Sequence, residues 1–336
     1  MFYFIEQNWP NGSQQLPQFD NVVVIGTYNR AHLLLRSLFH YQACKRADYY
    51  DITGDDAVRI LETGVVPKQS LALVIIDDGS TDYTEELCRK FANPDLPIFY
   101  FKLTDKEPGT WRDSAAFINM GISFAIHALG ASVVMPTHPE ICVGETTISD
   151  IVAYVTENRN SFGLAKGYYL TPEQQTKYAY DWQIAQHWSI PVGIDTPDQF
   201  WKYDATFIFI EENPDFYDYG DPTHAYHHTQ VEKAKVWGSW IFAGASRETW
   251  LKFGGLGESS KWGSVDLIFH WQRHHFGFAT WTPDARTSMV VHQNHDDPNI
   301  NTPTPRDLDL AHNEASLHQF TLEEKPNYLN PERWTK

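Results

Sequence analysis

A short apolar run followed at once by two acids constrains the fold more than any other feature of the sequence. Leu73–Ile76 predict a buried strand, and Asp77 and Asp78 come directly after it. Gly79 then allows a turn, and the Ser-Thr-Asp cluster behind it is suited to begin a helix. Because open α/β sheets bind their ligands at the carboxyl ends of parallel strands, we expect the two acids to lie at a ligand-binding edge.

An earlier apolar run, Val22–Ile25, ends in a comparable polar turn at Gly26–Arg30. Two such strand ends side by side predict a nucleotide pocket. Further strands are expected at 98–103, 132–135, 240–245 and 289–292, and helices at 31–38, 85–91, 111–129, 149–158, 247–253 and 264–275. This alternation predicts an α/β fold with a parallel sheet that is covered on both faces.

Composition and charge exclude several classes of protein. The net charge of −17 argues against general nucleic-acid binding and against anionic membranes, both of which need basic surface. No apolar run is long enough to span a membrane, and the first residues lack the pattern of a signal peptide. Three cysteines form no disulfide framework. The expected location is therefore the cytoplasm.

The domain organisation follows from changes in composition along the chain. Residues 1–20 are polar and predict an amino-terminal arm, and residues 21–295 are expected to form one domain. Within it, about 160–240 is rich in Tyr and Trp with weak periodicity, which favours a substrate-facing elaboration of the same domain. Residues 296–336, first proline-rich and then acidic, predict a tail on the surface.

The two polar turns resemble the opening of family 2 glycosyltransferases of the GT-A fold. In that family the first strand usually ends in Pro-Thr-Tyr-Asn-Arg and the second in Asp-Asp-Gly-Ser-Thr-Asp; here Gly26 replaces the proline and the other residues agree. The resemblance implies a Rossmann-like nucleotide-binding half, a mixed central sheet and helices on both faces. It also implies contacts with the donor nucleotide, made by Thr27, Tyr28, Asn29, Arg30, Asp77 and Asp78. The alternative is that Asp-Gly-Ser-Thr is only a helix-capping turn.

The resemblance also implies a metal site at the end of the strand at 132–135. The family usually has Asp-X-Asp there, holding Mn²⁺ or Mg²⁺ on the donor diphosphate, whereas this chain has Pro136-Thr137-His138. His138 resembles the histidine of the Asp-X-His form in polypeptide N-acetylgalactosaminyltransferases, and Glu140 supplies an acid nearby. His292, at a late strand end, is the expected partner ligand, and imidazole favours Mn²⁺ over Mg²⁺. Without a metal, Arg112 and Arg30 are the cations for the phosphates.

An acceptor-side signature is expected near residues 254–266. Gly254–Glu258 and Trp262-Gly263-Ser264-Val265-Asp266 resemble the Gly-Gly-Phe-Asp-Glu and Trp-Gly-Gly-Glu-Asp segments of the family, with Val265 in place of the glutamate. By this resemblance Asp266 is the general base for the acceptor hydroxyl, and His270, one turn later, would orient it. The alternative for Asp266 is a charge that stabilises a helix start.

Three hypotheses about function follow. The leading one is a hexosyltransferase-type enzyme that moves a sugar from a nucleotide-sugar, expected to be a UDP-sugar, to an acceptor hydroxyl with inversion. The second is a degenerate GT-A protein that binds nucleotide or glycan without catalysis, because acids are missing at Pro136 and Val265. The third is a nucleotidyltransferase, although Gly26–Arg30 has few glycines for its phosphate loop. The acceptor could be a glycan, a protein, a small molecule or a modified base, and no membrane partner is expected.

Overall fold

The computed structural model describes most of the predicted sheet and its helices. The described residues are 2–5, 16–44, 69–103, 114–144, 146–169, 242–258, 265, 269, 272–273, 275–281, 289–293 and 327–334. Among the described helices, none has the length and apolar character needed to cross a membrane.

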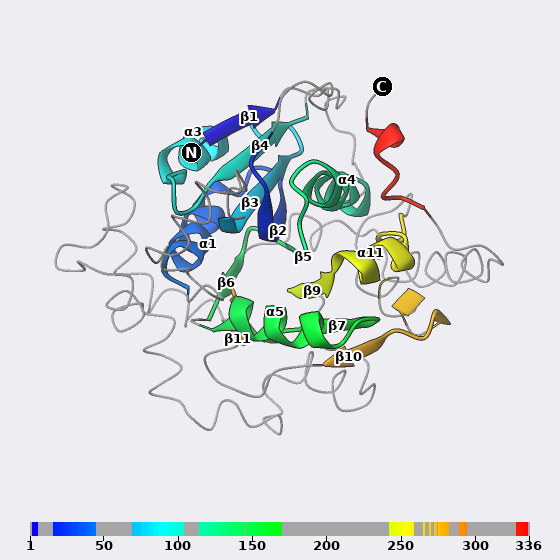
Figure 1. Ribbon diagram of the computed structural model, residues 1–336. Coiled ribbons are helices and arrows are strands. Elements are labelled where there is room, and N and C mark those ends of the chain that lie inside the picture. Colours follow the sequence, from blue (N-terminus) through cyan, green and yellow to red (C-terminus); the bar gives the residue numbers. More distant parts are fainter. Residues whose placement is uncertain are drawn as a thin grey trace, which may run out of the picture.

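An eight-stranded mixed sheet forms the centre of the described structure (Figure 1). In spatial order its strands are β1 (Phe2–Ile5), β4 (Ile98–Lys102), β3 (Gln69–Asp77), β2 (Phe19–Thr27), β5 (Val133–Thr137), β9 (Ala243–Ser246), β7 (Ser161–Leu164) and β10 (Ala279–Trp281). The strands from β1 to β5 are all parallel, whereas β9 runs antiparallel to both of its neighbours. The parallel part therefore presents several carboxyl ends at one edge.

A second sheet of three strands lies beside this edge. It consists of β6 (Ile141–Val143), β11 (Met289–His292) and β8 (Lys166–Tyr169), with β11 in the middle. The antiparallel register of β11 on β6 places His292 opposite Ile141. The small sheet thus brings a late segment of the chain to the residues that follow β5.

Helices cover both faces of the large sheet, as the α/β prediction requires. They are α1 (Ala31–Ala43), α3 (Thr84–Phe91), α4 (Ser114–His127), α5 (Thr147–Glu157) and α11 (Arg247–Phe253). Alternate strand residues belong to different cores: Val22 and Val24 pack in the cluster under α4 and α11, and Val23 and Ile25 pack under α1, α3 and α5. A strand buried on both faces needs a continuous apolar run, which explains the pattern in the sequence.

Some predicted elements have different bounds in the structure, and several short strands were not predicted. The short strands β6, β7, β8 and β10 gave no clear periodicity, because three or four residues are too few to show one. Within the predicted arm, β1 pairs with β4, and within the predicted tail, residues 327–334 pack on the fold. Most of the aromatic-rich segment, residues 170–241, lies outside the described residues, and the domain boundaries remain predictions.

Close packing of α4 on β2 explains why glycine replaces proline at position 26. A Cβ atom on Gly26 would lie 2.3 Å from Cε2 of Phe117 and 3.2 Å from Cγ1 of Ile118. Gly121 of α4 faces the sheet in the same way, since a Cβ there would lie 2.4 Å from Cγ1 of Val24. The close helix–sheet contact leaves no room for a side chain at either position.

We expect Gly26→Ala to lower the free energy of unfolding by about 1–3 kcal/mol, the usual cost of overpacking a core. Urea unfolding of the variant and of wild type measures the difference. Gly26→Ala combined with Phe117→Leu should recover part of the loss, because the smaller side chain relieves the same contact. A Gly26→Ala protein as stable as wild type would contradict this packing argument.

Candidate functional site

Hydrogen bonds join the two polar turns into one unit at the carboxyl edge of the sheet. The register pairs Thr27 with Asp77, and the Asp78 N–H donates to the Thr27 carbonyl at 2.9 Å. The Asn29 N–H donates to Ser80 Oγ at 2.8 Å, and Asn29 Oδ1 accepts from the Thr81 N–H at 2.8 Å. Asn29 itself has φ +50, a conformation that asparagine tolerates better than most residues. The predicted juxtaposition of the two strand ends is therefore present in the fold.

Asp82 links the same turns to two helices. Its Oδ2 accepts from the Ala31 N–H at 3.0 Å, at the start of α1, and its Oδ1 accepts from the Thr84 N–H at 3.1 Å, at the start of α3. The first turn of a helix has free N–H groups, and a carboxylate satisfies them and favours the helix dipole. The acid predicted to begin one helix thus caps two.

Asp77 is fully buried and holds the second turn in shape. Its Oδ1 accepts from the Ser80 N–H at 2.8 Å, and its Oδ2 accepts a short hydrogen bond from the Tyr100 hydroxyl. Burial raises the pKa of the Asp77 carboxyl above its usual value, while the bonds from Ser80 and Tyr100 and the charge of Lys102 oppose that shift. Burial also raises the pKa of Tyr100, with the Asp77 charge as the next cause. Both carboxylate oxygens of Asp77 are therefore engaged within the protein.

The other predicted nucleotide contacts differ in their exposure. Asp78 is 3% exposed and Thr27 is 2% exposed, whereas the Tyr28 side chain is 47% exposed. An exposed aromatic ring in the same pair of turns as buried polar groups is suited to stack on a planar base while those groups accept or donate hydrogen bonds. These exposures agree with the predicted pocket. The two neighbouring acids, Asp77 and Asp78, have different surroundings.

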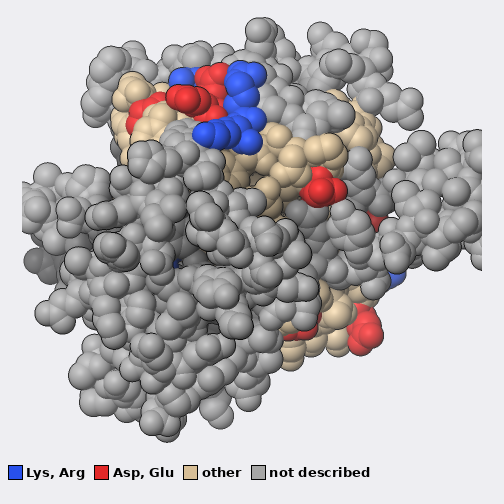
Figure 2. Space-filling model, turned by 90° about the vertical axis from the view of Figure 1, so that its left-hand side faces the viewer, with Lys and Arg blue, Asp and Glu red and all other residues tan. Residues whose placement is uncertain are grey.

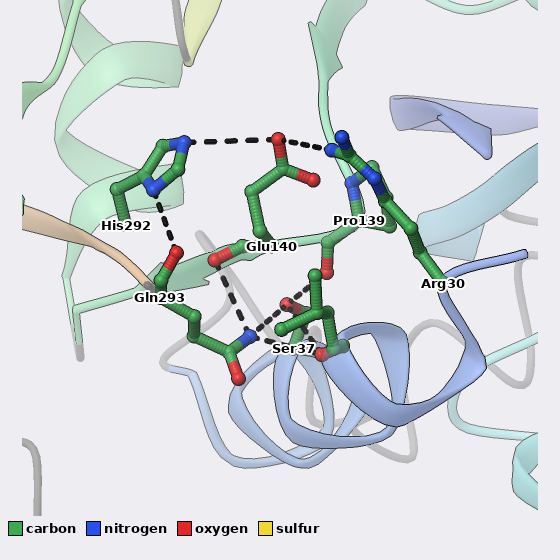
Figure 3. Close-up of polar contacts among 7 residues, drawn as sticks. Arg30, Ser37, Pro139, Glu140, His292 and Gln293 are labelled. Carbon is green, nitrogen blue, oxygen red and sulfur yellow. Dashed lines mark hydrogen bonds and ion pairs between the residues drawn. The ribbon is translucent and has the colours of Figure 1, made fainter. Parts of the chain in front are cut away.

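A second polar group brings three distant segments together beside the first (Figure 3). Arg30 Nη1 lies 2.9 Å from Glu140 Oε1, and His292 Nε2 lies 3.7 Å from the same oxygen. Arg30 follows β2, Glu140 follows β5, and His292 ends β11. The side chain of Glu140 is only 6% exposed, and Arg30 supplies a positive charge beside it.

Hydrogen bonds around His292 fix its ring. His292 Nδ1 lies 2.8 Å from the Gln293 carbonyl, which can only accept, so Nδ1 carries the proton and Nε2 faces Glu140. The Gln293 N–H donates to the Glu140 carbonyl at 3.0 Å. Gln293 Nε2 reaches the Leu33 carbonyl at 2.9 Å, and Ser37 Oγ donates to the Pro139 carbonyl at 2.6 Å. Helix α1 thus anchors the backbone on both sides of the carboxylate.

The pairing of His138 with His292 stays a prediction. His138 is half-buried at the end of β5, and its carbonyl accepts from the Ile141 N–H at 3.3 Å. The contact shown by His292 is with Glu140. Within the described ranges, no three His, Cys, Asp or Glu side chains gather into a complete metal-binding set. A cation here would need further ligands, such as water or substrate oxygens.

The remaining predicted site residues lie outside the described residues: Arg112, Trp262, Gly263, Asp266 and His270. Their neighbour Val265 is described, is helical, and is 6% exposed in the core cluster with Phe269. Packing therefore explains an apolar residue at position 265, where the resemblance predicts a glutamate.

Sequence reasoning did not find Tyr100, Ser37 or Gln293 as supporting residues. Tyr100 offers one signal, a hydroxyl in the middle of an otherwise apolar strand, which needs a buried partner. Ser37 and Gln293 give no such signal, because their partners are backbone carbonyls from remote segments.

Charged side chains of both signs adjoin on the face shown in Figure 2, where the described part of the surface is visible. On and beside α3, Glu85 pairs with Arg89 at 3.0 Å and with Lys102 at 3.9 Å. Such exposed pairs are typical of a solvated helix and contribute little stability.

Comparison of sequences finds one family. Residues 22–112 match the family described as Glycosyl transferase family 2, a range that includes both polar turns. No curated protein matches the chain. The resemblance to family 2 glycosyltransferases is thereby confirmed on the segment that carries its first motifs.

Two solved structures have a similar fold. S. aureus TarS 1–349 in complex with UDP-GlcNAc gives a TM-score of 0.53 at 12% identity, covering 94% of this chain and 70% of that chain. Mannosyltransferase PcManGT from Pyrobaculum calidifontis, in complex with GDP-Man and Mn²⁺, gives 0.52 at 16% identity, covering 93% and 67%. At such identities the likeness concerns the fold, and the predicted GT-A class is confirmed.

The hydrogen bond from Tyr100 to Asp77 should contribute more to the free energy of unfolding at high pH, where Asp77 is ionised, than at low pH. The raised pKa means that the protonated Asp77 favours the folded state, an advantage lost as pH rises through the folded pKa. Tyr100→Phe removes a bond that lowers this pKa, so the variant should lose about 1.5–3 kcal/mol at pH 8 but only about 0.5–1.5 at pH 4.5. Urea unfolding at both pH values measures this, with the exposed Tyr83→Phe as control. An equal loss at both pH values would contradict an ionised Asp77 as acceptor.

Proposed function

We propose that this chain, whose residues 22–112 carry the sequence of glycosyl transferase family 2, transfers a hexose from a UDP-sugar to an acceptor hydroxyl with inversion. The observation that carries the proposal is the cross-linked pair of turns at the carboxyl edge of β2 and β3, which combines an exposed tyrosine with buried polar groups. The family match supports glycosyl transfer, and the choice of donor and stereochemistry is our inference.

The donor nucleoside would bind at Tyr28 and Asp78. Tyr28 would stack on the base, and Asp78 would accept a hydrogen bond from the uracil N3–H or from a ribose hydroxyl. Asn29 and Thr27 would shape the pocket from the first turn. Because both oxygens of Asp77 already accept bonds from Ser80 and Tyr100, we assign Asp77 the role of holding the turn.

The donor diphosphate would lie near Arg30, Glu140 and His292. An imidazole whose Nδ1 donates to a carbonyl, with its Nε2 facing a buried carboxylate, suits a divalent cation such as Mn²⁺. A bound cation of this kind neutralises the charge that develops on a leaving diphosphate. His138 is a further candidate ligand. Arg30 and Arg112 would contact phosphate oxygens, for which the planar guanidinium is well shaped.

The acceptor would bind on the side of residues 254–270, within a proposed domain of residues 21–295. Asp266 would take the proton from the acceptor hydroxyl, and His270 would orient that carboxylate. Trp262 and Gly263 would contact the acceptor sugar, as would Glu140 on the other side. The acceptor class remains open among glycans, proteins, small molecules and modified bases. A binding protein without catalysis is the second candidate, because Val265 packs in the core where an acid is expected.

UDP should raise the melting temperature of the protein more than GDP, CDP or ADP. Asp78→Asn should weaken UDP binding roughly 10- to 100-fold, since a hydrogen bond to a charged group contributes about 1.5–3 kcal/mol. Isothermal titration with UDP measures the affinity, and the exposed Asp95→Asn serves as control. Equal shifts with all four nucleotides would contradict the base assignment.

Mn²⁺ should support turnover better than Mg²⁺, and EDTA should reduce it. Glu140→Gln and His292→Ala should each raise the Mn²⁺ concentration for half-maximal activity by roughly 10- to 100-fold. Manganese EPR of the protein with UDP gives the same comparison without turnover, and His127→Ala, an exposed histidine, is the control. Full activity in EDTA would transfer the phosphate role to Arg30 and Arg112.

Asp266→Asn should lower kcat by about 10²–10⁴-fold, the usual contribution of a general base. Affinity for UDP should stay unchanged, because the nucleotide would contact the other half of the sheet. UDP release with an acceptor that turns over measures kcat, beside a UDP titration of both proteins. Near-normal turnover would move the base elsewhere, and UDP binding by wild type without turnover on any acceptor would favour the binding protein.

A further inference from the structure

The last described segment of the chain packs against the acceptor side of the fold. Residues 327–334, which we name the C-terminal clasp, include the short helix η4 (Pro331–Arg333). Figure 1 shows η4, in red, beside α4, and the two are in contact. The loop after α11, Gly254–Glu258, lies against the same segment, and we name it the acceptor loop.

The clasp is anchored in the core. Leu329 is 1% exposed and belongs to the cluster under α4 and α11. Its carbonyl accepts from Ser123 Oγ at 2.8 Å, and the Tyr328 N–H donates to the Gly254 carbonyl at 2.8 Å. Gly255 has φ +95, and a Cβ there would lie 3.1 Å from Cβ of Tyr328. The clasp and the acceptor loop are therefore in direct backbone contact.

Arg333 forms a bidentate ion pair with Glu258, at the end of the acceptor loop. Its Nη1 lies 3.0 Å from Glu258 Oε1 and its Nη2 lies 2.9 Å from Glu258 Oε2. The guanidinium also lies 5.1 Å from the ring centre of Tyr328 and 4.9 Å from that of Trp334. The ion pair and the two aromatic rings together orient the guanidinium group. A lysine could not reproduce the paired bonds.

Two buried amides also hold the acceptor loop. Asn119 Nδ2 donates to the Leu256 carbonyl at 2.9 Å and to Glu258 Oε1 at 3.2 Å, while its Oδ1 accepts from the Leu256 N–H at 2.8 Å. Gln272 Nε2 donates to the Gly255 carbonyl at 2.9 Å, and its Oε1 accepts from the Gly257 N–H at 3.1 Å. Both oxygens of Glu258 are thus engaged in fixing the loop, which makes it a poor substitute for a general base.

We propose that Arg333 is a positioning residue for the acceptor side: through Glu258 the clasp fixes the acceptor loop, Gly254–Glu258, where the acceptor would bind. This inference rests on the proposed function. The ion pair is partly exposed, with 36% of the Arg333 and 20% of the Glu258 side chain accessible, so it contributes little to global stability. Its effect should fall on the geometry of the reacting groups, where small displacements reduce rates strongly.

Arg333→Ala should lower kcat/KM for the acceptor by roughly 10- to 100-fold. Affinity for UDP should stay within about twofold of wild type, and the melting temperature within about 2–4 °C, as for a loss of stability of the order of one exposed pair. Arg333→Lys should recover less than half of the loss on a logarithmic scale. Arg159→Ala is the matched control, because Arg159 pairs with Glu248 at 3.2 Å on another surface and is 71% exposed.

Normal acceptor kinetics in Arg333→Ala would overturn the proposal, as would an equal loss in Arg159→Ala. Hydrogen exchange of the Leu256 and Gly257 amides supplies a second readout that needs no turnover. These amides should exchange faster in Arg333→Ala and unchanged in Arg159→Ala. If wild type transfers no sugar, the proposed function fails, whatever the clasp does. Unchanged exchange in Arg333→Ala would separately refute the positioning role of the clasp.

Discussion

The parallel register of β2 and β3 is the constraint on which the rest of the structure depends. It places Thr27 opposite Asp77, so that both polar turns leave the sheet at the same level. This register lets Asn29 form hydrogen bonds with Ser80 and Thr81. It also lets Asp82, in the second turn, accept a hydrogen bond from the first residue of α1. Shifting the register by one residue would turn every apolar side chain to the opposite face and separate these groups.

Buried acids at the carboxyl edge are stabilised by partners from distant parts of the chain. Asp77 accepts a hydrogen bond from Tyr100, and Glu140 pairs with Arg30. Burying a carboxylate is costly unless hydrogen bonds or an opposite charge offset its lost hydration. The same requirement fixes the backbone around it: Gln293 and Ser37 tie β11, the turn after β5 and α1 into one framework. The chemistry proposed for this edge depends on a rigid framework of this kind.

Packing explains the residues at two of the three positions where the sequence differs from the expected family pattern. Gly26 leaves space for Phe117, and Val265 fills the core beside Phe269. Gly26 begins the first polar turn, and the hydrogen bonds between the turns start at the next residue, Thr27. The clasp adds contacts to the loop at Gly254–Glu258, so the geometry of this loop depends on residues from a distant part of the chain.

The sequence by itself determined the α/β class, the two strands that lead into the polar turns, and the helices that follow them, because apolar periodicity and turn residues are local properties. It could not separate the roles of Asp77 and Asp78, since the hydroxyl of Tyr100 meets only one of them. It could not place Glu140 against His292 or Arg333 against Glu258 either. Those contacts join segments more than seventy residues apart, and strand order and helix packing alone decide which segments meet.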